Sequence, residues 1–115
     1  VRTERRLFEG YLEVLEALMR HQGKTLYLGP VLDRVGDTEG LTRVASRVHR
    51  LAVPDRRVAQ MFSMNIQTWK SHAFIEESYP RARIDRMQRE LEDAVEDTGG
   101  GTTEWSIRQI VYRRN

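Results

Sequence analysis

The chain contains no cysteine and only three prolines among its 115 residues. The absence of cysteine excludes disulfide bridges, thiol catalysis and thiolate zinc sites, and it is typical of a cytoplasmic protein. No apolar run approaches the roughly 20 residues that a membrane-spanning helix needs. The arginines near the N-terminus are not followed by the uncharged apolar core of a signal peptide. We therefore expect a cytoplasmic protein that has no membrane partner.

The sequence offers little that could carry catalysis. The three histidines, His21, His49 and His72, are far apart, and none begins a metal-binding signature. The glycine run at 99–101 lacks the lysine and Ser/Thr that follow it in a phosphate-binding loop. No serine, threonine or carboxylate has the spacing of a nucleophile and its base. We expect a non-enzyme with no catalytic residues, no metal and no cofactor.

Lysine is scarce, since Lys24 and Lys70 are the only two among nineteen cationic residues. The other seventeen are arginines, whose planar guanidinium group binds phosphate oxygens through two parallel hydrogen bonds. Codon bias in a GC-rich genome would give the same ratio without any function. The net charge of +2 is also uninformative, so the positions of the arginines have to decide between the two interpretations.

Apolar residues recur at helical spacing along most of the chain. In residues 4–22 they form two adjacent rows, which predicts an amphipathic helix of about five turns. The fold class that we expect is all-α, a single-domain helical bundle of about six or seven helices. A bundle over 1–98 would be followed by a glycine linker at 99–101 and by a C-terminal helix over 102–115, although Trp105, Ile107 and Tyr112 would also suit a strand. The other expected helices cover residues 25–35, 41–52, 55–62, 66–79 and the segment after Pro80, with a turn at 63–65.

Basic residues concentrate in the middle of the sequence. Between residues 41 and 89 there are ten cations and four acids. Arg43, Arg47 and Arg50 recur at i, i+4 and i+7, which would place them on one face of the expected third helix. Such segregation is typical of a surface that follows a phosphate backbone. The candidate nucleic-acid-binding residues are Arg43, Arg47, Arg50, Arg56, Arg57, Lys70, Arg81, Arg83 and Arg86.

The expected helix after Pro80 has its charges reversed relative to its own dipole. Arg81, Arg83 and Arg86 lie in its first turns, and four acids crowd its last turns. A helix N-terminus favours acids, so local stability does not explain this order. Arginines there are suited to binding an anion. A solvated face of alternating charges is the competing interpretation.

Residues 55–72 resemble the helix-turn-helix segment of many transcription regulators. Val58, Ala59, Phe62, Ser63, Met64 and Trp69 stand where that pattern has its apolar, small and turn residues. The resemblance implies that Gln67, Thr68, Lys70 and Ser71 would face the major groove. Ser63 replaces the favoured glycine of the turn.

A broader likeness rests on RRLFEGYLEVLEALMRHQ followed by RVAQMFSMNIQTWKSHAFIEESYPRARI. This order resembles the helical small subunit of class 1 CRISPR effector complexes. It also resembles the related helical C-terminal part of some large subunits, where Thr68, Trp69, Tyr79 and Pro80 have counterparts, with Tyr79 and Pro80 in the opposite order. The resemblance implies a non-enzymatic subunit of a ribonucleoprotein that binds RNA, single-stranded DNA or both, contacts other subunits and self-associates in several copies. The alternative is a sequence-specific helix-turn-helix regulator, and a helical protein-interaction module is a third possibility.

Overall fold

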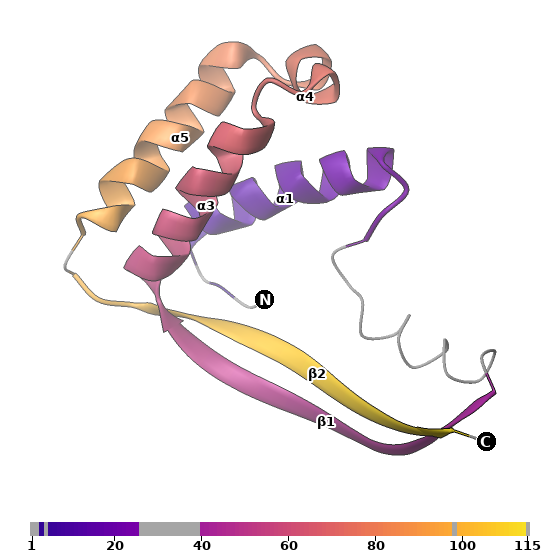
Figure 1. The fold of residues 1–115 in the computed structure, drawn as a ribbon. Helices are drawn as coiled ribbons and strands as arrows, with labels where there is room; N and C mark the ends of the chain where they lie inside the picture. The colour runs from indigo at the N-terminus through magenta and orange to yellow at the C-terminus, as the bar shows by residue number, and fades with distance from the viewer. Residues whose placement is uncertain (1–2, 4, 26–39, 98, 115) are drawn as a thin grey trace.

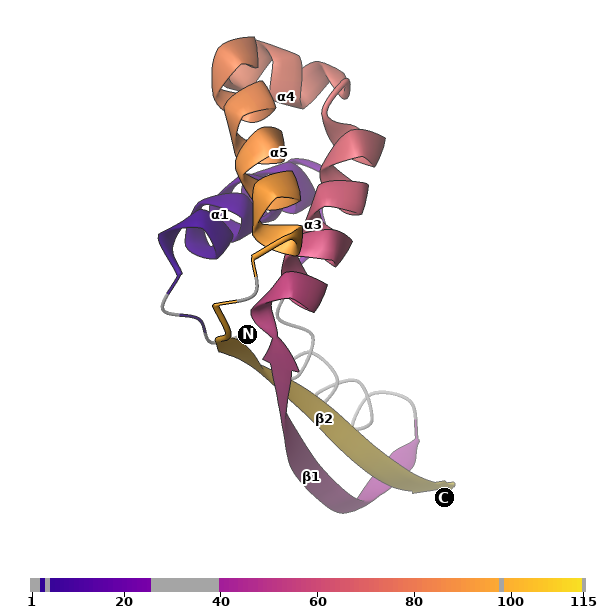
Figure 2. The same cartoon turned by 90° about the vertical axis from the view of Figure 1, so that its left-hand side faces the viewer.

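The computed structural model describes residues 3, 5–25, 40–97 and 99–114. Four helices form a body, and a two-stranded antiparallel ribbon projects from it (Figures 1 and 2). The expected helix at 25–35 lies almost wholly outside the described residues. The elements are, in order, α1 (Arg6–His21), β1 (Leu41–Pro54), α3 (Asp55–Trp69), α4 (Ala73–Ser78), α5 (Arg81–Val95) and β2 (Thr102–Arg114).

The hydrophobic core lies between α1, α3 and α5. The apolar rows predicted for residues 4–22 are confirmed, because Phe8, Tyr11, Val14 and Leu18 are buried along one side of α1. They meet the apolar sides of α3 and α5, which contribute Val58, Ala59, Phe62, Ile66, Ile84, Met87, Leu91 and Ala94.

Phe62 of α3 is the centre of an aromatic cluster. It stacks on Tyr11 at a centroid distance of 4.0 Å and meets Phe8 edge to face at 5.5 Å. Trp105, from the base of the ribbon, lies 6.4 Å from the same ring. One buried ring therefore joins α1, α3 and β2.

The all-α prediction is wrong, because the described chain combines four helices with a two-stranded sheet. Residues 41–52, expected as a helix, lie within β1. The apolar residues in this segment recur at helical spacing, but they do not form a buried face. Val44, Val48 and Leu51 are all about half exposed or more. A strand that is mostly solvated is under no pressure to alternate apolar and polar residues, so its pattern resembled a helix by coincidence.

The C-terminal segment is also a strand rather than the expected helix. β2 is rich in β-branched and aromatic residues, which favour extended backbone. It pairs with β1 from Leu41 opposite Arg114 to Pro54 opposite Thr102. Residues 102–114, expected within a helix that packs on the bundle, thus form half of the ribbon.

The expected turn at 63–65 is wrong as well, since α3 runs unbroken from Asp55 to Trp69. The chain turns instead at Lys70–His72, and the short helix α4 follows. The His72 ring accepts a 3.1 Å hydrogen bond from the amide of Phe74 and so caps α4. The helix expected after Pro80 is confirmed as α5, which packs along α3.

Candidate nucleic-acid interface

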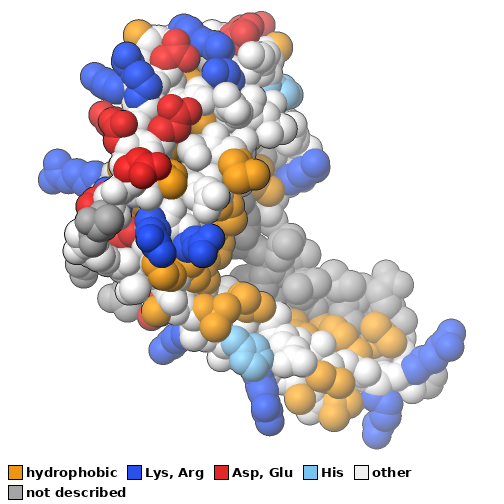
Figure 3. Space-filling model, turned by 60° about the vertical axis from the view of Figure 1, so that its left-hand side comes forward, with side chains coloured by type: hydrophobic (Ala, Val, Ile, Leu, Met, Phe, Trp, Pro, Cys, Tyr) orange, Lys and Arg blue, Asp and Glu red, His pale blue; other side chains and the backbone are white. Residues whose placement is uncertain are grey.

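The ribbon carries most of the segregated positive charge of the described chain. β1 and β2 together contain six arginines and a single acid, Glu104. The described helices contain eight arginines and ten acids. In Figure 3 the acidic side chains gather over the helical body, and basic side chains project from the ribbon. The charge asymmetry predicted from the sequence therefore follows the ribbon rather than a helix.

The register of the ribbon decides which arginines share a face. Side chains alternate between faces along a strand, so Arg50 and Arg47 point to opposite sides. A β-bulge at Val44 shifts the register, and Arg43 lies opposite Tyr112, on the same side as Arg50. The predicted single stripe of Arg43, Arg47 and Arg50 is thus split between two faces.

We call the side that includes Arg50 the Arg50 face. It is basic, its aliphatic residues are Leu41, Val48, Ala52 and Ile110, and it also includes Tyr112. Arg50 is 74% exposed, and its guanidinium lies 4.0 Å from the Glu104 carboxylate. Its cations are Arg43, Arg50, Arg108 and Arg114.

The opposite side, the Arg47 face, anchors the ribbon to the helical body. At its base Thr103 is fully buried, and Val53 and Trp105 pack against the core. Further out, His49 and Gln109 are joined by a 2.9 Å hydrogen bond between their side chains. The base of the Arg47 face is packed against the core. The Arg50 face, on the other side of the ribbon, is therefore directed away from the core.

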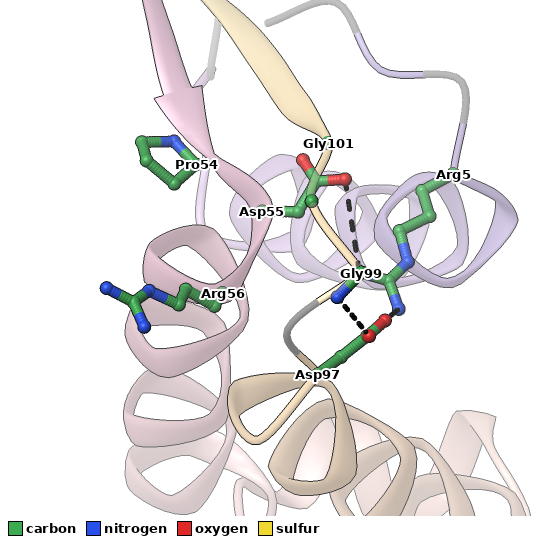
Figure 4. A pocket seen from close by; sticks show the side chains of 8 residues that line it. Arg5, Pro54, Asp55, Arg56, Asp97, Gly99 and Gly101 are labelled. Atoms are coloured by element: carbon green, nitrogen blue, oxygen red, sulfur yellow. Dashed lines mark hydrogen bonds and ion pairs between the residues drawn. The ribbon is translucent and has the colours of Figure 1, made fainter.

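A network of charges fixes the joint between ribbon and body (Figure 4). The Arg5 guanidinium lies 3.9 Å from the Asp55 carboxylate and 3.5 Å from that of Asp97. The Asp97 carboxylate also accepts a 2.8 Å hydrogen bond from the Gly99 amide. An open pocket of about 390 Å³ lies here, and the Arg56 side chain points away from these groups. The carboxylates of Asp55 and Asp97 neutralise the charge of Arg5, so the pocket does not favour an anion.

The remaining predicted residues lie outside the ribbon. Arg56 and Arg57 lie in the first turn of α3, directly after β1, and are exposed. Lys70 donates a 2.9 Å hydrogen bond to Gln88 Oε1, so its ammonium group is engaged with α5. Arg81 lies 3.3 Å from Asp85 and 4.0 Å from Glu76, an arrangement typical of a charge lattice.

Arg83 and Arg86 belong to a second, smaller cluster. Together with Arg6 they line a shallow pocket between the N-terminal parts of α1 and α5, where Glu90 is the acid. Arg83 also lies 5.2 Å from the ring centroid of Tyr79. The structure therefore separates the predicted residues into a ribbon group, a pair at the start of α3, Lys70 at the end of α3, and an α5 group.

Sequence reasoning missed Arg108, Arg113 and Arg114. They lie in β2, outside the basic segment 41–89, and join the other arginines only through the pairing of β2 with β1. The available signal was the recurrence of β-branched and aromatic residues between 102 and 112, which marks a strand that needs a partner.

No family model, curated protein or solved structure matches the chain. Within the described residues no three His, Asp or Glu side chains gather as metal ligands. Among the helices that the structure describes, none has the length and apolar character to cross a bilayer.

Proposed function

We propose that this chain is a non-enzymatic nucleic-acid-binding protein that grips the phosphate backbone of a double helix with its ribbon. One observation carries the proposal: four arginines and one acid share the Arg50 face of a ribbon that projects from the body. Guanidinium groups on an exposed strand can reach phosphates without moving the core.

The dimensions of the ribbon suit a duplex groove. Neighbouring strands lie about 4.8 Å apart, so a two-stranded ribbon fits the roughly 12 Å wide major groove of B-form DNA. At about 3.3 Å per residue, thirteen paired residues extend over about 43 Å, which exceeds one helical turn of DNA. The arginines can therefore meet several successive phosphates.

The aromatic residues favour a duplex over a single strand. Proteins that bind single strands without sequence preference stack bases on exposed aromatic rings. The two aromatic residues of the ribbon are Trp105, which packs against the core, and Tyr112, which is only partly exposed. Apart from Tyr112, the Arg50 face presents aliphatic groups and serines, which suit the edges of paired bases.

The earlier family resemblances stay predictions. A CRISPR small subunit would be all-helical, and the ribbon departs from that fold. A helix-turn-helix regulator would place its turn at 63–65, where α3 is continuous. Assembly with other subunits and self-association are compatible with backbone binding, and co-purification with RNA and protein partners would test them.

A fluorescence-anisotropy titration tests the proposed function. Random-sequence duplex DNA, single-stranded DNA and single-stranded RNA are each titrated with the full chain at 50 and 200 mM salt. We expect the duplex to bind most tightly and to lose at least tenfold in affinity at the higher salt. The double variant Arg50→Ala/Arg108→Ala should weaken duplex binding, and Arg89→Ala, on α5, should not. Absence of binding at 50 mM, or equal loss in both variants, would overturn the proposal.

A further inference from the structure

The outward face of α3 is free of acids. Counting around the helix from the buried Val58, Phe62 and Ile66 places six exposed residues on the opposite side. Asp55, the one acid of α3, is turned inward to Thr103 and Arg5. The members of this outward face are Arg57, Gln60, Met61, Met64, Gln67 and Thr68.

No other described helix has such a face. α1 exposes Glu9 and Glu13, and α4 exposes Glu76 and Glu77. The exposed side of α5 includes glutamates and aspartates along its second half. A polyanion approaching the helical body would therefore meet least repulsion at α3.

The outward face is also chemically suited to base edges. Gln60 and Gln67 are seven residues apart, two turns along the same side, and each amide can bond an adenine through its N6 and N7 atoms. Met64, 65% exposed, lies between them and offers an apolar group to a thymine methyl. The Thr68 hydroxyl donates to the Met64 carbonyl at 3.3 Å.

The outward face begins next to the point where the ribbon joins the body. β1 ends at Pro54 and α3 begins at Asp55, with no linker between them, and Arg56 and Arg57 lie at this junction. A partner held by the ribbon therefore has the start of α3 beside it (Figure 2).

We propose that α3 lies in the major groove of B-form DNA and gives the protein a sequence preference through Gln60, Met64 and Gln67. This inference rests on the proposed function, in which the ribbon supplies the backbone contacts. An α-helix enters the wide major groove of B-form DNA, whereas the major groove of A-form RNA is too narrow for side chains to read. The preferred partner is therefore duplex DNA.

Selection from a random duplex DNA library, with the full-length chain, tests the inference. Wild type should enrich a defined motif that contains A·T pairs. Gln60→Ala and Gln67→Ala should each reduce the preference for that motif over random duplex by about tenfold, while random-duplex affinity changes less than twofold. Gln22→Ala, an exposed glutamine beyond the end of α1, is the matched control and should keep the full preference.

The outcomes separate the inference from the proposed function. Salt-dependent duplex binding without any enriched motif overturns the inference and leaves the ribbon proposal intact. An enriched motif that survives both glutamine substitutions also overturns the inference. If Arg50→Ala/Arg108→Ala binds the motif as tightly as wild type does, the result supports base recognition by α3 and overturns the proposed role of the ribbon. If the protein binds no duplex, or binds duplex RNA as tightly as duplex DNA, the proposal that α3 recognises bases in DNA is overturned.

Discussion

The hydroxyl of Thr103, in β2, donates a 2.7 Å hydrogen bond to the carboxylate Oδ1 of Asp55, the first residue of α3. Thr103 is fully buried, and the Asp55 side chain is 17% exposed. This bond joins the ribbon to the helix that follows the other strand. The bond fixes the direction in which the ribbon leaves the body. It therefore also fixes how the ribbon and α3, the two proposed binding elements, are placed relative to each other.

Replacing Thr103 by valine keeps the shape of the side chain and removes the donor. We expect the free energy of unfolding to fall by about 2 kcal/mol, because a buried hydrogen bond to a charged group is lost. Urea denaturation measures the change. Thr102→Val, at the exposed neighbouring position, is the control and should change stability by less than about 0.5 kcal/mol. Equal midpoints for the two variants would contradict the role of this bond.

Gly101 lies close to the same carboxylate. A Cβ atom at this position would be 2.7 Å from Asp55 Oδ2, and Asp55 is held by Thr103 and Arg5. We expect Gly101→Ala to destabilise the protein by about 1–3 kcal/mol. Gly10→Ala is the contrast: it lies within α1, and its added methyl would meet only the end of Met87 at 3.9 Å. It should stabilise by about 0.5–1 kcal/mol, and a thermal melt of both variants checks the two signs.

The Tyr11 hydroxyl is buried without a hydrogen-bond partner among the described residues. Burial raises the pKa of Tyr11 above its ordinary value near 10, and the nearby Asn65 and Trp69 side chains offset this only in part. The unfolded state therefore loses this proton first, and the contribution of Tyr11 to stability is complete below pH 10 and lost as pH rises through the folded pKa.

Tyr11→Phe should change the free energy of unfolding by less than about 1 kcal/mol at pH 8, because the hydroxyl has no partner in good hydrogen-bond geometry among the described residues. Between pH 10 and 11 the stability of wild type should fall more steeply than that of the variant. Urea midpoints at the two pH values measure both effects. A loss above about 1 kcal/mol at pH 8 would show that the hydroxyl is bonded in the folded protein.

Lys70 is a predicted nucleic-acid contact that the structure engages elsewhere. Because its ammonium group donates to Gln88, we expect Lys70→Ala to lower stability by about 1 kcal/mol and to change duplex affinity by less than twofold. Lys24→Ala removes the same charge from an exposed position after α1 and should leave stability unchanged. A tenfold loss of affinity in Lys70→Ala alone would restore Lys70 to the binding surface.

The helical core could be predicted because burial imposes its period on the sequence. Leu18 and Leu91 belong to stripes that recur every three or four residues, and both are buried on the expected sides. The ribbon could not be predicted in this way. The ribbon is stabilised by pairing between two strands, residues 41–54 and 102–114, whose partners are about 60 positions apart in the sequence. Most of their side chains are exposed, so burial imposes no period on them.

The candidate site was predictable in composition and not in geometry. Arg43, Arg47 and Arg50 were found as a cluster, but the bulge at Val44 and the alternation of a strand determine which of them share a face. Arg108 joins them only through strand pairing. The acid-free side of α3 became visible once the helix was known to run through residues 63–65.

The salt dependence of duplex binding tests the central claim most directly. The observed binding constant of wild type and of Arg43→Ala/Arg50→Ala/Arg108→Ala is measured from 50 to 300 mM salt, with Arg83→Ala/Arg86→Ala/Arg89→Ala as a control of equal charge change on α5. Each lost phosphate contact lowers the slope of log K against log salt by about 0.9. The account predicts a slope reduced by nearly three in the ribbon variant and unchanged in the α5 variant. Equal slopes for wild type and the ribbon variant, or the larger reduction in the α5 variant, would contradict it.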